Sequence, residues 1–319
     1  MMQLRVVCPA QLADGVLGTL RDELGAIAIT STDSSSGTVI TADVARESAN
    51  NLLDRLHELN VFDEGMITLA PLDTALGHLA TKAEQDAPGE GADAVIWDDL
   101  AERTGEDSQL TWNFLAFIVL ATLLGAIGVV TDSTVTIVGA MVIGPEFGPL
   151  AGLALGLMRR RGQIARRAAV ALLVGFPVAI VTVSGLALLG RLVGLFNVQD
   201  VTRHNQTEFI YHPGWFSLIT ALVAGAAGML SLTSSKSAAL VGVFISVTTI
   251  PAAGNAAVAA VVGAWHQSGE SLLQLTINLV GIVTAGVVTL AVLELARPGR
   301  PERRRDGRRG RPGVRGRGA

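Results

Sequence analysis

Glu146 is the residue of this chain best placed to do chemistry, because it lies halfway along an apolar run, residues 138–156, that is long enough to cross a bilayer. Pro145 precedes it and Pro149 follows; each proline removes a backbone donor and crowds the preceding helical turn. A carboxylate at the centre of a bilayer costs roughly 2.5–3.5 kcal/mol on insertion scales and usually belongs to an ion path or proton relay. We therefore interpret Glu146 as a candidate binding residue; the alternative is a structural hydrogen bond across a helical bundle.

The backbone around this carboxylate is expected to be broken rather than continuously helical. Inside hydrocarbon, the N–H and C=O groups freed by a break must be satisfied by protein or by a water-filled cavity, so the break must lie inside a bundle. Glycines also recur at every fourth position, which offers a flat face for the close approach of another helix. These glycines are Gly144, Gly148, Gly152 and Gly156.

A second candidate group surrounds Pro251 and Gly254 in a later apolar run. Thr248, Thr249 and Asn255 supply hydroxyl and amide groups there. At an interrupted membrane helix, exposed amides favour anions and exposed carbonyls favour cations. These three side chains either line an ion or solute site or cap the interrupted helices, and the sequence leaves both interpretations open.

The two groups occupy equivalent places in an internal repeat. Three motifs recur in the same order at offsets of 100, 103 and 106 residues. The matched segments are 125–128 with 225–228, 138–139 with 241–242, and 145–148 with 251–254. A unit of three crossings enters the membrane inverted when it is repeated, and inverted repeats with a broken helix in each half are typical of secondary transporters and some channels.

Hydropathy predicts six membrane spans, and positive charges predict their orientation. Arginines crowd the connection after the second span and the end of the chain after the sixth, so both are expected to face the cytoplasm, with both termini. The outer loops are then residues 191–214 and 264–270. The spans are approximately 112–130, 134–158, 166–190, 215–232, 237–263 and 271–296.

Composition separates an acidic front from an apolar centre and a basic end. Half of the 319 residues are hydrophobic and the mean hydropathy is +0.47, which is typical of a membrane protein. Residues 1–110 hold 6 Lys and Arg against 20 Asp and Glu, a net charge of −14, whereas residues 297–319 hold ten arginines. Cys8 is the only cysteine of the sequence, which excludes an internal disulfide and fits a reducing, cytosolic setting for the front.

The front, residues 1–75, is expected to be a small ferredoxin-like domain. Strand and helix patterns follow the order β-α-β-β-α-β, which places both helices on one face of an antiparallel sheet. This fold defines no function, and both a ligand-sensing or assembly domain and a plain cytosolic cap are compatible with it. Residues 76–110 are interpreted as a linker with an amphipathic helix around Trp97, on the membrane surface or on the bundle, and residues 297–319 as a disordered arginine-rich tail.

Several classes of function are excluded by motifs that the sequence lacks. It contains no nucleotide loop, nucleophile elbow or metalloprotease helix, so we expect neither an enzyme nor a cofactor. His204, His212 and His266 fall in the expected outer loops, but their spacing matches no compact metal motif, so we predict no metal site. The basic tail is interpreted as an orientation signal and lipid contact rather than as a nucleic-acid interface.

Several motifs in order resemble the "domain of unknown function 389" family of prokaryotic membrane proteins. They are the segments 123–133, 137–145, 148–157 and 240–243, followed by Pro251. The resemblance covers residues from about 95 to 295. It implies a prokaryotic plasma-membrane protein with a soluble amino-terminal domain, and it implies no settled activity and no catalytic residues.

The expected fold class is thus an α-helical membrane bundle of six transmembrane helices, residues 111–296, in an inverted 3+3 repeat with broken helices, preceded by a small α+β domain. We expect a homo-oligomer in the lipid bilayer that moves a small ion or polar solute through sites at residues 145–149 and 248–255. The alternative is a membrane-anchored sensor or scaffold, in which the bundle transports nothing and the front domain binds a ligand or partner.

Overall fold

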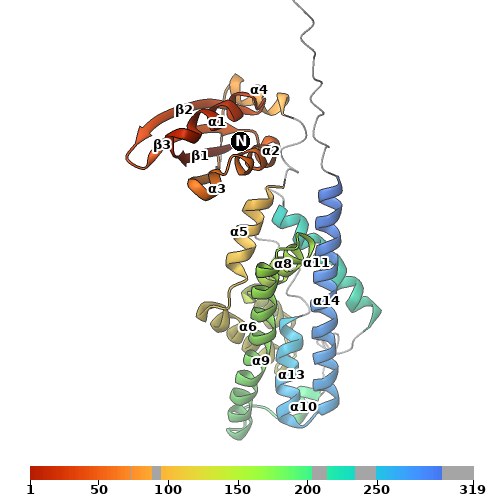
Figure 1. The fold of residues 1–319 in the computed structure, drawn as a ribbon. Helices are drawn as coiled ribbons and strands as arrows, with labels where there is room; N and C mark the ends of the chain where they lie inside the picture. The colour runs from red at the N-terminus through yellow and green to blue at the C-terminus, as the bar shows by residue number, and fades with distance from the viewer. Residues whose placement is uncertain (73, 88–94, 203–213, 234–248, 297–319) are drawn as a thin grey trace, which may run out of the picture.

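A small α+β domain stands at one end of a long helical bundle (Figure 1). The computed structural model describes residues 1–72, 74–87, 95–202, 214–233 and 249–296. Within these residues helices predominate, and the strands belong to the front domain. The arginine-rich tail, the candidate site residue Thr248, the repeat segment 241–242 and part of the predicted fifth span lie outside the described residues.

A four-stranded antiparallel sheet of order β2-β3-β1-β4 forms the front domain. Its strands and helices follow the predicted order β-α-β-β-α-β, with one additional short helix before the last strand. This order is the ferredoxin-like arrangement. The elements are β1 (Met2–Cys8), α1 (Ala10–Arg21), β2 (Ala26–Ser34), β3 (Gly37–Val44), α2 (Arg46–Glu58), α3 (Val61–Glu64) and β4 (Met66–Pro71).

One face of this sheet carries the core of the front domain. Along β1, Leu4, Val6 and Cys8 are buried, whereas the residues between them are exposed or half-buried. Successive side chains of a strand point to opposite faces, so this alternation defines a single inner face. Leu20 of α1 and Leu56 of α2 pack against that face, so both helices cover it.

Cys8 lies at the end of β1 within this core, with 1% of its surface exposed. Burial raises the pKa of the Cys8 thiol, so the reactive thiolate is scarce in the folded protein. We expect a charged methanethiosulfonate reagent to modify Cys8 far more slowly in the native protein than in sodium dodecyl sulfate, as measured by intact mass. Because the pKa of the Cys8 thiol is higher in the folded than in the unfolded protein, the free energy of unfolding falls as the pH rises past the pKa of the unfolded state. Equally fast labelling in both conditions would contradict the buried position.

Two helices, α4 (His78–Asp86) and α5 (Trp97–Asp107), lie between the front domain and the bundle in the chain. The side chain of Asn50 on α2 accepts a hydrogen bond of 3.1 Å from the Trp97 backbone, which ties the start of α5 to the front domain. The Trp97 side chain is buried, and the Arg159 guanidinium lies 4.3 Å from its ring centroid. Since α5 packs along α8, the amphipathic helix predicted around Trp97 lies on the bundle.

Four helices of the bundle, α6, α9, α11 and α14, are each long and apolar enough to cross a membrane. The pair α7 and α8, bent by 54° at its junction, adds a fifth candidate if it counts as one broken span, and α13 is a shorter apolar helix. The bounds are α6 (Trp112–Val130), α7 (Thr134–Ile143), α8 (Phe147–Met158), α9 (Gly162–Leu192), α10 (Val198–Thr202), α11 (Trp215–Thr233), α13 (Ile250–Val262) and α14 (Trp265–Leu295). The described residues therefore hold four or five candidate spans.

The outer loop predicted at residues 264–270 is wrong. A tight turn joins α13 to α14: Gly263 adopts a φ of 83°, and α14 begins at Trp265. Hydropathy misplaced the start of the last span because its first turns are polar. Ser268, however, is buried and donates a hydrogen bond of 2.9 Å to the Ala256 carbonyl of α13, so this polar residue faces protein.

Candidate functional site

The span that contains Glu146 is broken at the place that its prolines predict. Gly144, Pro145 and Glu146 separate α7 from α8, and the two helices are bent by 54°. Pro149 lies in the first turn of α8, where a missing N–H costs no helical hydrogen bond. A side chain at Gly144 would collide with the Glu146 carboxylate, so the glycine makes room for the acid.

Glu146 is fully buried, and its Oε1 accepts a hydrogen bond of 2.6 Å from Thr249 Oγ1. Thr249 is also fully buried and is the residue immediately before α13. Pro251 lies in the first turn of α13, as Pro149 does in α8. The fold therefore brings one residue of each predicted group into direct contact, although 103 positions separate them in the chain.

The helices α8 and α13 leave this contact in opposite directions along α14. Arg159 at the end of α8 pairs with Glu294 near the end of α14 at 3.1 Å, so these two helices run parallel. A tight turn joins α13 to α14, and Asn255 donates to Ser271 near the start of α14 at 2.7 Å, so these two run antiparallel. Both helices thus begin beside Glu146 and direct the positive ends of their dipoles toward its buried side chain.

A row of polar side chains lies along one face of α14. Gln267, Ser271, Gln274 and Asn278 follow one another at intervals of four, three and four residues, the spacing of one helical face. The last three are at most 1% exposed, and Gln274 Nε2 donates to Asn278 Oδ1 at 3.3 Å. We call these four residues the α14 polar row. Three of them, Gln267, Ser271 and Gln274, were not predicted, although their spacing in an apolar span was a usable signal.

Asn255 of α13 is hydrogen-bonded into the α14 polar row. Its Nδ2 donates to Ser271 Oγ at 2.7 Å, and its Oδ1 accepts from Gln267 Nε2 at 3.0 Å. Asn255 and Ser271 are in contact, and the two antiparallel helices run away from this contact in the same direction when α13 is followed backward and α14 forward. Six residues along either helix cover ~9 Å, which leads to Thr249 on α13 and to the residue before Asn278 on α14. The deep end of the row therefore lies level with the contact between Thr249 and the buried carboxylate.

The glycine face of α8 is closely packed. At Gly148 and Gly152 the near neighbour is α5, and at Gly156 a β-carbon would lie 2.6 Å from the Ala165 nitrogen of α9. Gly254 of α13 is packed against the backbone of α6 in the same manner. These glycines allow the helices to approach closely, so they help to position α8 and α13.

A cleft of about 400 Å³ reaches the first break from the connection between α5 and α6. It is lined by Pro145 and Gly148 of the break and by Asp107 and Thr111 of the connection, among other residues. Burial, and secondarily the charge of Glu106, raises the pKa of Asp107. The break that holds the buried carboxylate is therefore close to an opening lined by polar residues.

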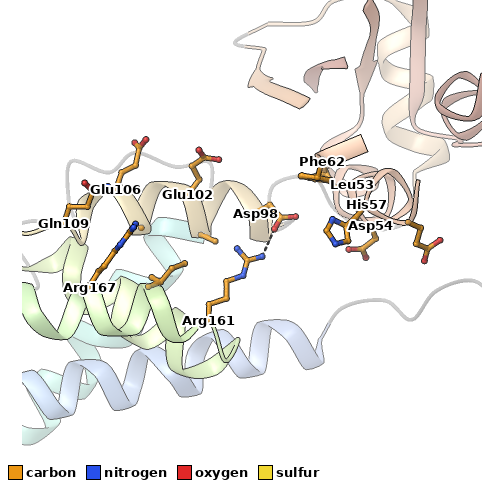
Figure 2. Close-up of a pocket in the computed structure, with 14 residues that line it drawn as sticks. Leu53, Asp54, His57, Phe62, Asp98, Glu102, Glu106, Gln109, Arg161 and Arg167 are labelled. Carbon is orange, nitrogen blue, oxygen red and sulfur yellow. Dashed lines mark hydrogen bonds and ion pairs between the residues drawn. The ribbon is translucent and has the colours of Figure 1, made fainter. Parts of the chain in front are cut away.

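A larger cleft of about 970 Å³ lies between the front domain and the bundle. Figure 2 shows side chains of both charges along it, with Arg161 bonded to Asp98 at 2.8 Å. Its labelled lining residues are Leu53, Asp54, His57 and Phe62 of the front domain, Asp98, Glu102, Glu106 and Gln109 on and after α5, and Arg161 and Arg167 of α9. A small polar ligand bound here would touch both parts of the molecule.

The described residues contain no cluster of three or more His, Cys, Asp or Glu side chains that could hold a metal ion. His266 instead pairs with Glu270 at 3.4 Å on the first turns of α14. His204 and His212 lie outside the described part of the chain.

The length and composition of the apolar helices indicate a helical membrane protein. Residues 141–284 match the family described as "Domain of unknown function (DUF389)". An uncharacterized protein of the archaeon Methanocaldococcus jannaschii is 24% identical over 205 residues, which cover 64% of this chain and 62% of the relative. No solved structure matches the chain. The resemblance to the DUF389 family is thus confirmed over a region that includes Glu146, Thr249 and the α14 polar row, and it assigns no activity.

Proposed function

We propose that the protein is a transporter or channel that moves a small ion or polar solute across the plasma membrane, past the contact between Glu146 and Thr249. The observation that carries this proposal is the fully buried side chain of Glu146, which accepts a hydrogen bond from Thr249 where α8 and α13 begin. Removing a carboxylate from water costs several kcal/mol even after relaxation. A mobile ion or proton at this place would offset that cost and give the acid a use.

The opposite courses of α8 and α13 support an inverted 3+3 repeat with six crossings, in which both termini face the cytoplasm. The halves are not packed identically, however, because Gly148 meets α5 whereas Gly254 meets α6. Since Asn50 ties α5 to the front domain, the front domain would act on the first break through this helix. The homo-oligomeric state expected from the sequence belongs to the same proposal, as does the absence of catalytic chemistry.

Flux into vesicles tests this function directly. The purified protein would be reconstituted into liposomes, and entry of protons, sodium, rubidium and chloride would be followed with a trapped pH dye and radioactive tracers, under a pH gradient and under a voltage. We expect at least one probe to enter about tenfold faster than into protein-free vesicles. Protein-free rates for every probe, with correctly folded protein in the vesicles, would refute transport of these ions.

The large cleft supports a second candidate, a sensor whose ligand binds between the front domain and the bundle. A panel of small charged metabolites would be screened by thermal unfolding of the detergent-solubilised protein. A true ligand is expected to raise the Tm of the wild type and of Arg166→Glu, and to leave Arg167→Glu unchanged, because Arg167 lines the cleft and the adjacent exposed Arg166 does not. Equal stabilisation of both variants would place the ligand elsewhere.

A further inference from the structure

The α14 polar row contains a buried oxygen whose hydrogen-bonding capacity is unused. Gln274 is 1% exposed, and its Nε2 donates to Asn278. Its Oε1 has no hydrogen-bond partner among the residues that the structure describes. An unpaired buried acceptor costs about 1–3 kcal/mol, so this position suits a guest that donates a hydrogen bond or coordinates the oxygen, such as a water molecule or a cation.

The chemistry around this oxygen favours a positively charged guest. The row and Asn255 offer hydroxyl and amide oxygens, and the acidic side chain of Glu146 lies level with the deep end of the row. Alkali and other hard cations prefer oxygen ligands of this kind. The positive ends of α8 and α13, which would otherwise attract an anion, already face the protein's own carboxylate.

The row also extends from the buried carboxylate to one end of the bundle. Gln267 at its shallow end donates to the Val201 carbonyl of α10 at 2.9 Å. Figure 1 places α10 at the end of the bundle away from the front domain, where α13 turns into α14. The row therefore runs from the level of Glu146 to the end of the bundle that the positive charges predict to be outside the cell.

We propose that the α14 polar row is the outer half of the transport path and that the transported species is a small monovalent cation, a proton or an alkali ion. This inference rests on the transport function proposed above. Gln274 Oε1 and Glu146 hold the cation at the deep end, and Asn255 with Gln267 lines the entrance. Water occupies the remainder of the row while the path is open to the outside.

Cysteine accessibility tests the path without requiring a known substrate. Cys8 would first be replaced by serine, and Ser271→Cys, Gln274→Cys and Leu273→Cys would then be made separately. Leu273 is a matched control, because it lies at the same depth on α14 but is 52% exposed on the outside of the bundle. Each variant in liposomes would receive a membrane-impermeant methanethiosulfonate carrying either a trimethylammonium or a sulfonate group, and the labelling rate would be measured by intact mass.

We expect Ser271→Cys and Gln274→Cys to be labelled, at least tenfold faster by the cationic than by the anionic reagent after correction for their rates with a free thiol. Leu273→Cys should remain nearly unlabelled by both. Unlabelled row cysteines, or faster labelling by the anionic reagent, would overturn the inference. Ser271→Cys changes a single atom, so it decides the question even if Gln274→Cys fails to fold.

The accessibility result and the flux result separate the two proposals. Row cysteines that react in vesicles showing no flux of any probe would contradict the transport function. Unreactive row cysteines in vesicles whose flux depends on Glu146 would leave transport standing and place its outer path elsewhere.

Discussion

Glu146→Gln is expected to reduce flux of the transported species at least tenfold while leaving the protein folded. The glutamine amide has nearly the same shape as the carboxyl group. It retains an oxygen that can accept the hydrogen bond from Thr249 Oγ1, which is 2.6 Å long in the wild type. What it loses is the negative charge and the ability to bind a proton. A tenfold loss corresponds to about 1.4 kcal/mol. This is a small effect for the removal of a charge that two helix dipoles and a hydroxyl donor stabilise.

The matched control for this variant is Glu270→Gln. Glu270 is a carboxylate of the same bundle, but it pairs with His266 on the first turns of α14 and lies outside the polar row. It should retain wild-type flux, since it removes an equal charge away from the path. Flux would be measured in the vesicles described above, with folding checked by gel filtration. Unchanged flux in Glu146→Gln would mean that Glu146 only joins the start of α8 to the start of α13.

Gly254→Ala is expected to destabilise the bundle by about 1–3 kcal/mol, because a methyl group there has no room. The added β-carbon would lie 2.6 Å from the Ala126 nitrogen, 2.9 Å from the Gly125 carbonyl carbon and 3.0 Å from the Thr122 oxygen. All three are backbone atoms of α6, so no side-chain rotation can relieve the overlap. The two helices must separate, which also displaces the neighbouring Asn255 from its hydrogen bonds.

Gly185→Ala on α9 is the control for this substitution. A β-carbon at Gly185 meets nothing within 4 Å, and alanine favours the helix over glycine by about 1 kcal/mol in exposed positions. Thermal unfolding in detergent should therefore show a lower Tm for Gly254→Ala and an unchanged or higher Tm for Gly185→Ala. Equal Tm values for the two variants would show that α6 and α13 are packed less closely than the structure indicates.

Local patterns in the sequence predicted the elements whose causes are local. The alternation of buried residues in β1 and the helical spacing of leucines in α2 are enough to predict the order of the front domain. Likewise, prolines disturb a helix through their own backbone, so the break before α8 was predictable from Pro145 and Pro149 alone.

Polar residues inside the bundle were predicted poorly, because their partners lie far along the chain. Ser271 and Gln267 were taken for the edge of a membrane span or an outer loop, since polarity alone does not distinguish a residue that faces water from one that faces protein. Their hydrogen bonds to Asn255 make the second environment favourable, and these bonds exist only once α13 and α14 are antiparallel.

The sequence by itself determined that the chain has the apolar helices of a membrane protein, an acidic front domain and a helix interrupted before α8, because hydropathy, charge and proline act within a few residues. The tertiary structure alone decided that Glu146 meets Thr249, that α5 packs on the glycines of α8 and that polar side chains align along α14. Each of these contacts joins residues distant in the chain, and a pairing of that kind depends on which helix faces which, a choice that the packing of the whole bundle makes.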